Sequence, residues 1–334
     1  MKELALIEQI LRDFSPSRNR ALALGIGDDC AILRPPLGSE VLVTTDFTLE
    51  GRHFRRDLHP PESVGHRCLA RGLSDLAAMG ATPVAAFLSL ALPSSLLASP
   101  QSRTWISRFF KGLRALADRH RITLAGGDTA ESPTDAILAD IVLLGSAPTG
   151  RSLRRSGAGP GDILYVTGSL GGAAAELSAM LTGSPRIAKI AQTANHPQTF
   201  PQPRISVGQA LVRRRLATAA IDISDGLSTD LAHLCHASNV AAELEQSAIP
   251  LHPLTRKHAP EAALNLALHG GEDYELLFSS PASTRVPRQL AGIPVTRIGR
   301  FTRKSAKHPR MTLVGSDGRR ATLEPQGWEH FSSR

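Results

Sequence analysis

The chain has 334 residues, of which 42% are hydrophobic and 20% charged, and its formal net charge is +8. This length corresponds to roughly two domains, and the composition is that of a folded protein rather than a disordered one. Aromatic residues make up only 4% and there are three scattered cysteines, Cys30, Cys68 and Cys235, which argues against base-stacking surfaces, a disulfide framework and a thiolate metal cage.

Apolar runs of strand length alternate with helical patterns along the chain, which predicts a mixed α/β fold. The predicted strands are residues 41–47, 84–92, 122–125, 136–145, 163–166 and 219–223. The predicted helices are residues 61–79, 100–120, 173–181, 205–216 and 227–237.

One uncharged segment, residues 76–102, needs a check as a membrane span. Gly80, Pro83 and Pro93 interrupt it, so a helix followed by a buried strand fits better than a continuous span of about 20 apolar residues. The start of the chain carries no apolar signal stretch, and an odd number of cysteines suits a reducing compartment. We therefore expect a soluble, cytoplasmic protein with no membrane partner.

A cluster of Pro, Gly and Arg at residues 146–160 separates two of the predicted strands. Such a composition is typical of a linker or of a loop between domains. It predicts a domain of residues 1–148 and a second domain of residues 149–334.

Aspartates at the ends of apolar, strand-like stretches are the most informative feature of the sequence. Six of them stand beside Gly, Ser or Thr: Asp29, Asp46, Asp75, Asp128, Asp222 and Asp225. An ionised carboxylate beside a buried strand is costly unless something compensates its charge. Each acid alone could be a helix cap or a turn residue, but six of one kind favour divalent cations.

Magnesium prefers oxygen ligands, commonly a few carboxylates together with phosphate oxygens and water. Thr44 and Thr45 add oxygens next to Asp46, and the Asp222-x-Ser224 spacing aims both side chains at one face of a strand. The pattern therefore predicts several magnesium ions around a polyphosphate. Walker A is absent, and the turn at residues 166–172 lacks the dinucleotide glycine spacing.

Taken together, these motifs resemble the thiamine-monophosphate kinase family, within the superfamily of ATP-binding enzymes that includes aminoimidazole ribonucleotide synthetase and selenophosphate synthetase. The resemblance covers about residues 24–331. It is carried by Gly25–Ala31, Thr44-Thr45-Asp46, Glu50–Phe54, Leu73–Ala81, Gly126–Thr129, Arg155-Ser156-Gly157, Ile221–Leu227, Gly270–Leu276 and Gly327–Phe331. Arg71-Gly72 departs from the Val-Asn that many relatives carry before Leu-Ser-Asp.

The resemblance implies ATP-dependent phosphorylation of thiamine monophosphate to thiamine diphosphate, by direct transfer between the substrates. The implied magnesium ligands are Asp29, Thr44, Thr45, Asp46, Asp75, Asp128, Asp222 and Asp225. The implied ATP contacts are Gly127, Asp128, Arg155 and Ser224, and the implied thiamine monophosphate contacts are His53, Glu272 and Trp328. Turnover is expected to depend on Asp46, Asp128 and Arg155.

The physical chemistry of these residues agrees with the implied roles. Magnesium neutralises the repulsion between two polyanions, and positioning supplies most of the rate of phosphoryl transfer. Arg155 can hold phosphate oxygens in a fork, and the face of Trp328 suits a cationic or pyrimidine ring. The resemblance also implies a two-domain α/β (α+β) fold in which the sheets of the N-terminal domains pair into a homodimer.

Two alternatives remain at this point. One is another ATP-using synthetase of the same superfamily, although the Gly270–Leu276 run and the ending at Trp328 favour the kinase. The other is a basic nucleic-acid-binding protein, which the net charge and the basic segment at residues 297–310 would suit. Low aromatic content, the lack of a nucleic-acid-binding motif and the string of aspartates argue against it, so we expect no nucleic-acid partner.

Overall fold

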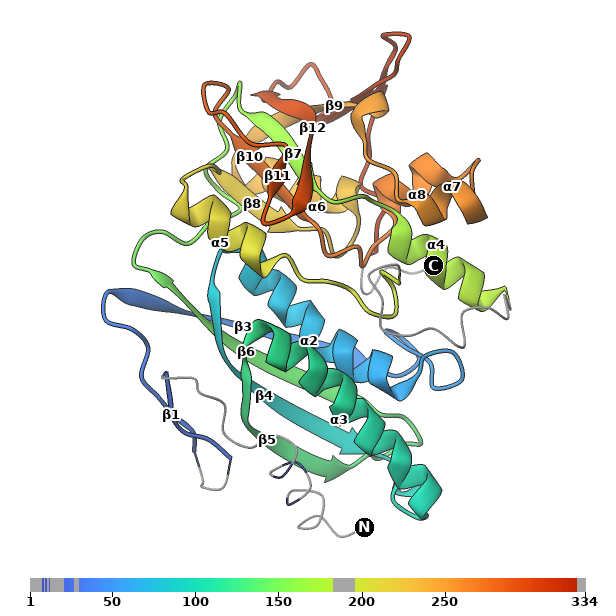
Figure 1. The fold of residues 1–334 in the computed structure, drawn as a ribbon. Helices are drawn as coiled ribbons and strands as arrows, with labels where there is room; N and C mark the ends of the chain where they lie inside the picture. Colours follow the sequence, from blue (N-terminus) through green and yellow to red (C-terminus); the bar gives the residue numbers. More distant parts are fainter. Residues whose placement is uncertain are drawn as a thin grey trace. The chain divides into compact units, whose positions relative to one another are not determined.

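The computed structural model describes residues 8, 10, 12, 21–26, 30–182 and 196–328 (Figure 1). The described residues form two compact units. The first contains those up to residue 76 together with residues 81–150, and the second contains residues 77–80 and those from residue 151 onward.

The first unit is built on a four-stranded sheet with two long helices. Its strands are β1 (Leu22–Leu24), β2 (Ile32–Leu33), β3 (Ser39–Leu49), β4 (Thr82–Leu92), β5 (Thr123–Glu131) and β6 (Leu138–Pro148), and its helices are α2 (Pro61–Ala78), η1 (Ser94–Leu96) and α3 (Pro100–His120). The sheet order is β3-β6-β4-β5, with only β4 and β5 parallel among these neighbours. Helices α2 and α3 lie side by side across one face of the sheet (Figure 1).

The two helices approach each other closely because each places a glycine against the backbone of the other. A Cβ added at Gly65 of α2 would lie 1.9 Å from the carbonyl oxygen of Phe109, and one at Gly112 of α3 would lie 1.9 Å from that of Glu62. A Cβ at either position would force the two helices apart and disrupt their packing. Glycine at both positions therefore sets the spacing of this helix layer.

The ends of α3 follow the local rules for helix termini. The Ser99 hydroxyl caps the helix by accepting from the N–H of Ser102, and Pro100 occupies the first turn. At the other end Arg121 adopts the left-handed conformation, with φ of 55°, and closes the helix.

The second unit is built on an eight-stranded sheet. Its strands are β7 (Ile163–Thr167), β8 (Ala219–Asp222), β9 (Val240–Glu245), β10 (Leu276–Ser280), β11 (Gln289–Leu290), β12 (Ile293–Arg303), β13 (Met311–Val314) and β14 (Arg320–Thr322). Its helices are α4 (Gly172–Leu181), α5 (Ile205–Arg213), α6 (Leu227–Ala237), η2 (Gln246–Ala248), α7 (Pro253–His258) and α8 (Ala263–His269). The strand order is β14-β13-β9-β12-β7-β10-β8, and β11 pairs with β12.

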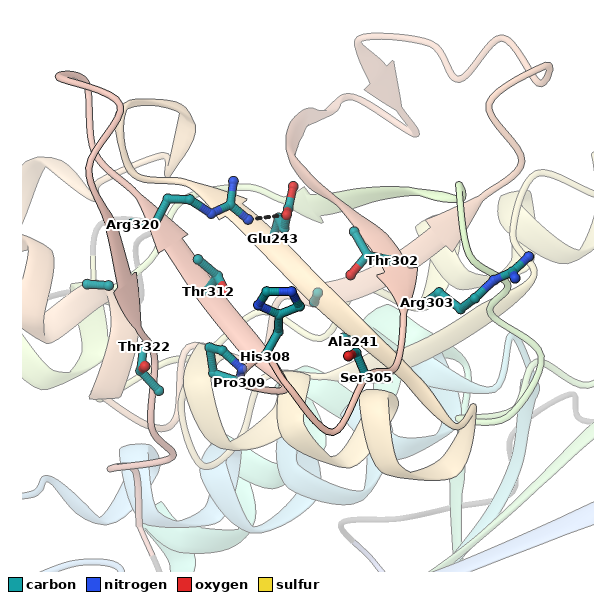
Figure 2. Close-up of a pocket in the computed structure, with 12 residues that line it drawn as sticks. Ala241, Glu243, Thr302, Arg303, Ser305, His308, Pro309, Thr312, Arg320 and Thr322 are labelled. Atoms are coloured by element: carbon teal, nitrogen blue, oxygen red, sulfur yellow. Dashed lines mark hydrogen bonds and ion pairs between the residues drawn. The ribbon is translucent and has the colours of Figure 1, made fainter.

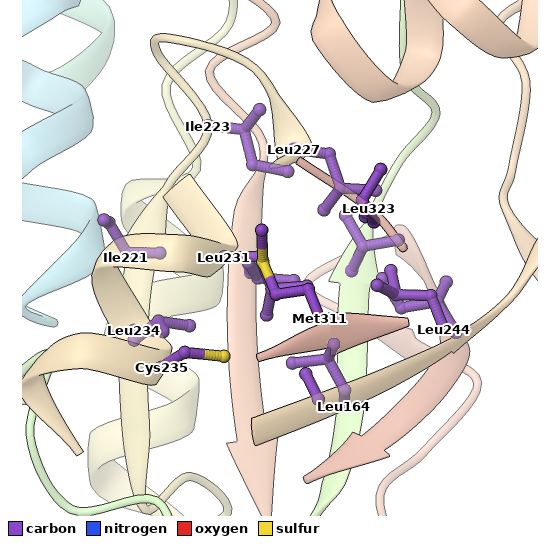
Figure 3. Packing of buried hydrophobic residues seen from close by; sticks show 14 of the residues in the cluster. Leu164, Ile221, Ile223, Leu227, Leu231, Leu234, Cys235, Leu244, Met311 and Leu323 are labelled. Atoms are coloured by element: carbon purple, nitrogen blue, oxygen red, sulfur yellow. The ribbon is translucent and has the colours of Figure 1, made fainter. Parts of the chain in front are cut away.

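The core of the second unit lies between α6 and the sheet. Leu231 and Leu234 of α6 are fully buried and pack with Leu164, Leu244 and Met311 from the strands (Figure 3). Burying each such side chain contributes about 1.5–3 kcal/mol. This packing holds α6 against the sheet, and the turn that follows β8 leads into the first residue of α6, Leu227.

The α/β fold expected from the sequence is confirmed, and each predicted strand and helix overlaps an observed one, with the largest shift at β5, which extends to Glu131 instead of residue 125. No strand or helix was predicted beyond residue 237, where β9 to β14, α7 and α8 lie. Strand β9 illustrates the difficulty, because its sequence VAAELE favours a helix by propensity. It is a strand because β12 and β13 pair with it on both sides.

Residues 76–102 comprise the end of α2, strand β4, η1 and the start of α3, as the interpretation against a membrane span required. Among the described residues, no helix is both long enough and apolar enough to cross a membrane.

Candidate active site

One group of predicted site residues lies between β3 and α2 in the first unit. Thr44 and Asp46 alternate along β3 and so share the face of the sheet that α2 covers. The Thr44 hydroxyl donates to the carboxylate of Asp75 on α2. Arg71, one turn earlier on α2, donates from Nε and Nη2 to Oδ1 of Asp46, at 3.3 and 3.1 Å. The carboxylate of Asp46 is thus balanced by a partly buried guanidinium.

Cys68 lies on α2 next to this group and is completely buried. Burial raises the pKa of its thiol to about 12, with a hydrogen bond to Thr48 and the charge of Arg71 acting in the opposite direction. The residue is therefore a neutral thiol at physiological pH and not a thiolate ligand.

A second group lies on the opposite face of the same sheet. The Thr45 hydroxyl donates to Oδ1 of Asp140 on β6 at 2.7 Å. Ser89 on β4 is the register partner of both Asp140 and Asp128, and cross-strand partners point to the same face. The predicted ligands of the first unit therefore divide into Thr44, Asp46 and Asp75 on one face and Thr45 and Asp128 on the other.

Gly127 precedes Asp128 at a point of very close backbone approach. Its φ is +152°, and a Cβ there would lie 2.0 Å from the carbonyl oxygen of Leu88 on β4. Glycine is therefore required by the sheet itself, whatever it contacts in a ligand. Asp128 is exposed, and its carboxylate accepts from the N–H of Thr129 at 2.8 Å.

His53 lies in the loop after β3 and is half-buried. Its Nδ1 accepts from the N–H of Leu49 at 3.0 Å, and Arg67 donates to its carbonyl oxygen at 2.9 Å. Since Nδ1 accepts, the neutral ring carries its proton on Nε2. The loop thus fixes both the ring position and its tautomer.

In the second unit, Asp222 is the last residue of β8, and Ser224 and Asp225 lie on the turn that leads from it to α6. One oxygen of Asp230, on the first turns of α6, accepts from the N–H groups of Ser224, Asp225 and Gly226, each at 3.1 Å. Gly226 has φ of +114°, a conformation that a side chain would strain. Asp230 thus determines the shape of the turn that presents the two predicted metal ligands.

The acids of this turn repel one another. Burial raises the pKa of Asp230 well above its usual value, and the charges of Asp222 and Asp225 raise it further. Ligand atoms of Asp225, Asp230 and His233 lie within 4.8 Å of one another. The two carboxylates offer the oxygen ligands that magnesium prefers, whereas the imidazole of His233 does not.

Two further segments are hydrogen-bonded to this turn. The N–H of Glu272 donates to the carbonyl oxygen of Ser224 at 2.7 Å, and the N–H of Trp328 donates to that of Asp225 at 3.0 Å. Glu272 has φ of 67°, a conformation that is uncommon outside glycine and is found at functional turns. The structure therefore brings Ser224, Asp225, Glu272 and Trp328 together from three distant parts of the sequence.

Two buried acids follow Glu272 in the chain, and the first of them supports the start of α4. Asp273 accepts from the N–H groups of Gly171 at 2.6 Å and Ala173 at 3.1 Å. Glu275 accepts from the Thr167 hydroxyl at 2.6 Å and pairs with Arg204. Burial raises the pKa of Asp273 to about 7, although the two N–H groups lower it.

Arg155 does not lie beside this turn. Its carbonyl oxygen accepts from the hydroxyl of Ser238, which follows the last residue of α6. Because α6 has 11 residues and is therefore about 16 Å long, the backbone of Arg155 and the turn at Ser224 lie at opposite ends of the helix. Arg155 and this turn can bind the same ligand only if the ligand extends along α6 or the arginine side chain extends toward the turn.

Asp29 lies outside the described residues. Arg71, Asp140 and Asp230 were not predicted as site residues, although Arg71 was noted as a departure from the family pattern. Asp140 carries the signal used for the other acids, since it stands within the apolar run of β6, whereas Asp230 reads as an ordinary helical acid.

The chain is similar to known proteins in sequence. Family models described as AIR synthase related protein, N-terminal domain and C-terminal domain, match residues 27–147 and 159–308. The chain is 39% identical over 333 residues to thiamine-monophosphate kinase of Escherichia coli K12, covering 97% of both chains. It is 34% identical to that of Bacillus subtilis, covering 92% of this chain and 93% of the relative.

Solved structures give the same result. Thiamine-monophosphate kinase from Stenotrophomonas maltophilia K279a superposes with a TM-score of 0.81 at 35% identity, covering 96% of this chain and 98% of the other. AaThiL complexed with AMPPCP and TMP gives 0.74 at 29% identity, with 98% and 97% covered. The hydrogenase maturation protein HypE in complex with ATP gives 0.76 at 18% identity, which shows a shared fold alone.

Proposed function

Because the chain belongs to the thiamine-monophosphate kinase family of AIR synthase related proteins, we propose that it phosphorylates thiamine monophosphate with ATP in a magnesium-dependent reaction. The products are thiamine diphosphate and ADP. The observation that carries the proposal is the meeting of Ser224, Asp225, Glu272 and Trp328 on one turn of the second unit.

The proposed cation ligands form two groups, one in each unit. Asp222 and Asp225 would hold magnesium at the β8–α6 turn, and Asp29, Asp46, Asp75 and Asp128, with Thr44 and Thr45, would hold it in the first unit. Bound magnesium neutralises phosphate charge and holds the reacting oxygens in line. The mutual repulsion around Asp230 supports this assignment, because a divalent cation relieves it.

The protein's own groups orient the substrates. Asp230 fixes the amides and carbonyls of the turn, so that Ser224 can contact ATP in a defined position. Gly127, Asp128 and Arg155 are the other proposed ATP contacts. Trp328 offers a partly exposed indole face to a cationic ring, and Glu272 offers an acceptor to the aminopyrimidine. His53 is a further proposed contact of thiamine monophosphate.

The transfer is proposed to be direct, from ATP to the phosphate of thiamine monophosphate. Asp46, Asp128 and Arg155 are the residues on which its rate would depend most. Positioning of two polyanions supplies most of the acceleration in such reactions.

The open face of the first unit's sheet supports a homodimer. Val41, Val43 and Phe47 alternate along β3 and are 48%, 65% and 61% exposed. Apolar side chains gathered on one sheet face indicate an interface. We propose that two copies pair through this face, and that the enzyme works in the cytoplasm, where its cysteines stay as the free thiols observed.

The proposal is tested by ADP release from ATP with three alternative acceptors: thiamine monophosphate, free thiamine and an aminoimidazole precursor. Turnover with thiamine monophosphate alone, and only with magnesium present, is expected. Turnover with the aminoimidazole compound instead would assign the chain to another reaction of the superfamily.

A further inference from the structure

A pocket on the outer face of the second unit's sheet takes no part in the proposed reaction. It is a cavity of about 590 Å³ over β9, β12, β13 and β14, closed on one side by the loop between β12 and β13. Its polar lining consists of Glu243, Thr302, Arg303, Ser305, His308, Thr312, Arg320 and Thr322. Figure 2 shows His308 and Thr312 among the residues that line this hollow, with Arg320 reaching toward Glu243.

The pocket carries an excess of positive charge. Arg300 donates to Oε2 of Glu243 from Nε and Nη2, at 3.1 and 2.8 Å, and Arg320 donates to Oε1. The single carboxylate therefore faces two guanidinium groups, and each guanidinium has further N–H donors. Burial would raise the pKa of Glu243, but these hydrogen bonds outweigh it and lower the pKa, so Glu243 is ionised at neutral pH.

Further cations and donors surround this pair. Arg303 lines the rim, and Lys304 and Lys307 stand in the exposed β12–β13 loop. Thr302, Thr312 and Thr322, which lie on the strands, add hydroxyl groups to the lining of the pocket. Ala241, Pro309 and Ala321 supply an apolar part of the lining. Arg303, Lys304 and Lys307 belong to the basic segment at residues 297–310, to which the proposed kinase reaction assigns no role.

The sheet order separates this pocket from the β8–α6 turn. Strand β8 is one edge of the sheet, and β12, the nearest strand of the pocket, is separated from it by β7 and β10. Three strand spacings amount to about 14 Å. The pocket is therefore a separate place on the same unit.

We propose that this pocket binds a phosphorylated small molecule. Guanidinium forks and hydroxyl groups are the donors that recognise phosphate oxygens. The cavity is far larger than one phosphate and falls within the range of ligand pockets, so the organic part of the ligand lies against Ala241, Pro309 and Ala321. A concave pocket lined by no Phe, Tyr or Trp side chain suits a small phosphate ester better than a nucleic acid.

Isothermal titration of the full-length protein with ribose 5-phosphate, inorganic phosphate and ribose tests the proposal. The titrations are done with EDTA, so that magnesium-dependent binding at the kinase residues is suppressed. Saturable binding of ribose 5-phosphate, weaker binding of phosphate and no binding of ribose are expected. If neither ribose 5-phosphate nor inorganic phosphate binds saturably, the proposal is overturned.

Variants locate the binding. Arg320→Gln should weaken ribose 5-phosphate binding at least about tenfold, and His308→Ala, in the exposed loop, should weaken it as well. Arg285→Gln removes the same charge from an exposed position outside the pocket and should leave the affinity within about twofold. Kinase turnover should stay unchanged in all three variants, which shows that they fold.

Equal losses in Arg320→Gln and Arg285→Gln would mean general attraction to a basic protein and would overturn the site. The variant Glu243→Gln gives a test of opposite sign. It removes the negative charge that holds Arg300 and Arg320, so ribose 5-phosphate should bind severalfold more tightly. Weaker binding in this variant would contradict the charge argument.

Discussion

The backbone N–H of Trp328 donates to the carbonyl oxygen of Asp225 at 3.0 Å. Gly327 makes this approach possible, because a Cβ there would lie 2.0 Å from the same oxygen. An aromatic residue near the end of the chain is thereby fixed on the turn that carries two predicted metal ligands. A proposed substrate contact and a proposed metal ligand are thus joined by one hydrogen bond.

Replacement of Trp328 by alanine should raise the KM for thiamine monophosphate roughly tenfold, because the indole face contributes about 1–2 kcal/mol to binding a cationic ring. The KM for ATP should change much less. Steady-state kinetics with each substrate varied in turn measures both constants, and an unchanged KM for thiamine monophosphate would remove Trp328 from the pocket.

The matched control is Trp105→Phe, since Trp105 is the other tryptophan of the chain and stacks on Phe109 in the first unit. Its kinetics should be close to those of the native enzyme. Trp328 is then the sole indole, so its fluorescence should change on addition of thiamine monophosphate.

Asp230 should matter through the turn that it shapes. Asp230→Ala leaves three backbone N–H groups without their acceptor, which should lower the free energy of unfolding by about 1–3 kcal/mol and reduce turnover. Asp230→Asn keeps an oxygen in place and should be the milder change. Urea unfolding and magnesium titration of turnover compare the two, and equal effects would contradict the role of the acceptor oxygen.

Asp273 should make stability depend on pH. Its pKa is raised to about 7 in the folded protein, mainly by burial, from an ordinary value near 4. Between these values the folded state binds more protons than the unfolded state, so this group's contribution to stability is greatest at low pH and falls as the pH rises toward 7.

The expected fall is up to about 1.4 kcal/mol per pH unit. Urea unfolding at pH 5, 6, 7 and 8 measures it, and Asp273→Asn, which does not titrate, should show a correspondingly flatter profile. Identical profiles for the two proteins would contradict the raised pKa.

The spacing of α2 and α3 gives a further prediction. Gly65→Ala places a methyl group against the carbonyl oxygen of Phe109 and should destabilise the protein by about 1–3 kcal/mol, although alanine is the better helix former. Gly159→Ala is the control, because a Cβ there has nothing within 4 Å. Thermal unfolding compares them, and equal melting temperatures would show that the helices can separate without cost.

Sequence patterns predicted the first half of the fold well, because long apolar strands and helices with clear ends, such as α3, are specified locally. Strand β9 could not be predicted in this way, since only its neighbours in the sheet make it a strand. The end of the chain is similar, because β13 and β14 are short and are defined by pairing.

The candidate site shows the same division. Acids beside apolar runs were visible in the sequence, but their places were not: Asp46 and Asp128 lie inside β3 and β5, on opposite sides of one sheet. Asp230 was invisible because its role depends on the backbone of a turn four to six residues earlier. The meeting of Glu272 and Trp328 on that turn also depends on long-range folding, although the resemblance had assigned both to one substrate.

The central claim is that aspartates of both units serve one magnesium-dependent phosphoryl transfer. Its most direct test follows the labelled γ-phosphate of ATP into thiamine diphosphate, with the native enzyme, Asp46→Asn and Asp225→Asn, at saturating magnesium. We predict that the native enzyme transfers label to thiamine diphosphate. Each variant should transfer it at least about a hundredfold more slowly, with a melting temperature within a few degrees of the native value. Undiminished transfer of label by either folded variant would contradict the claim.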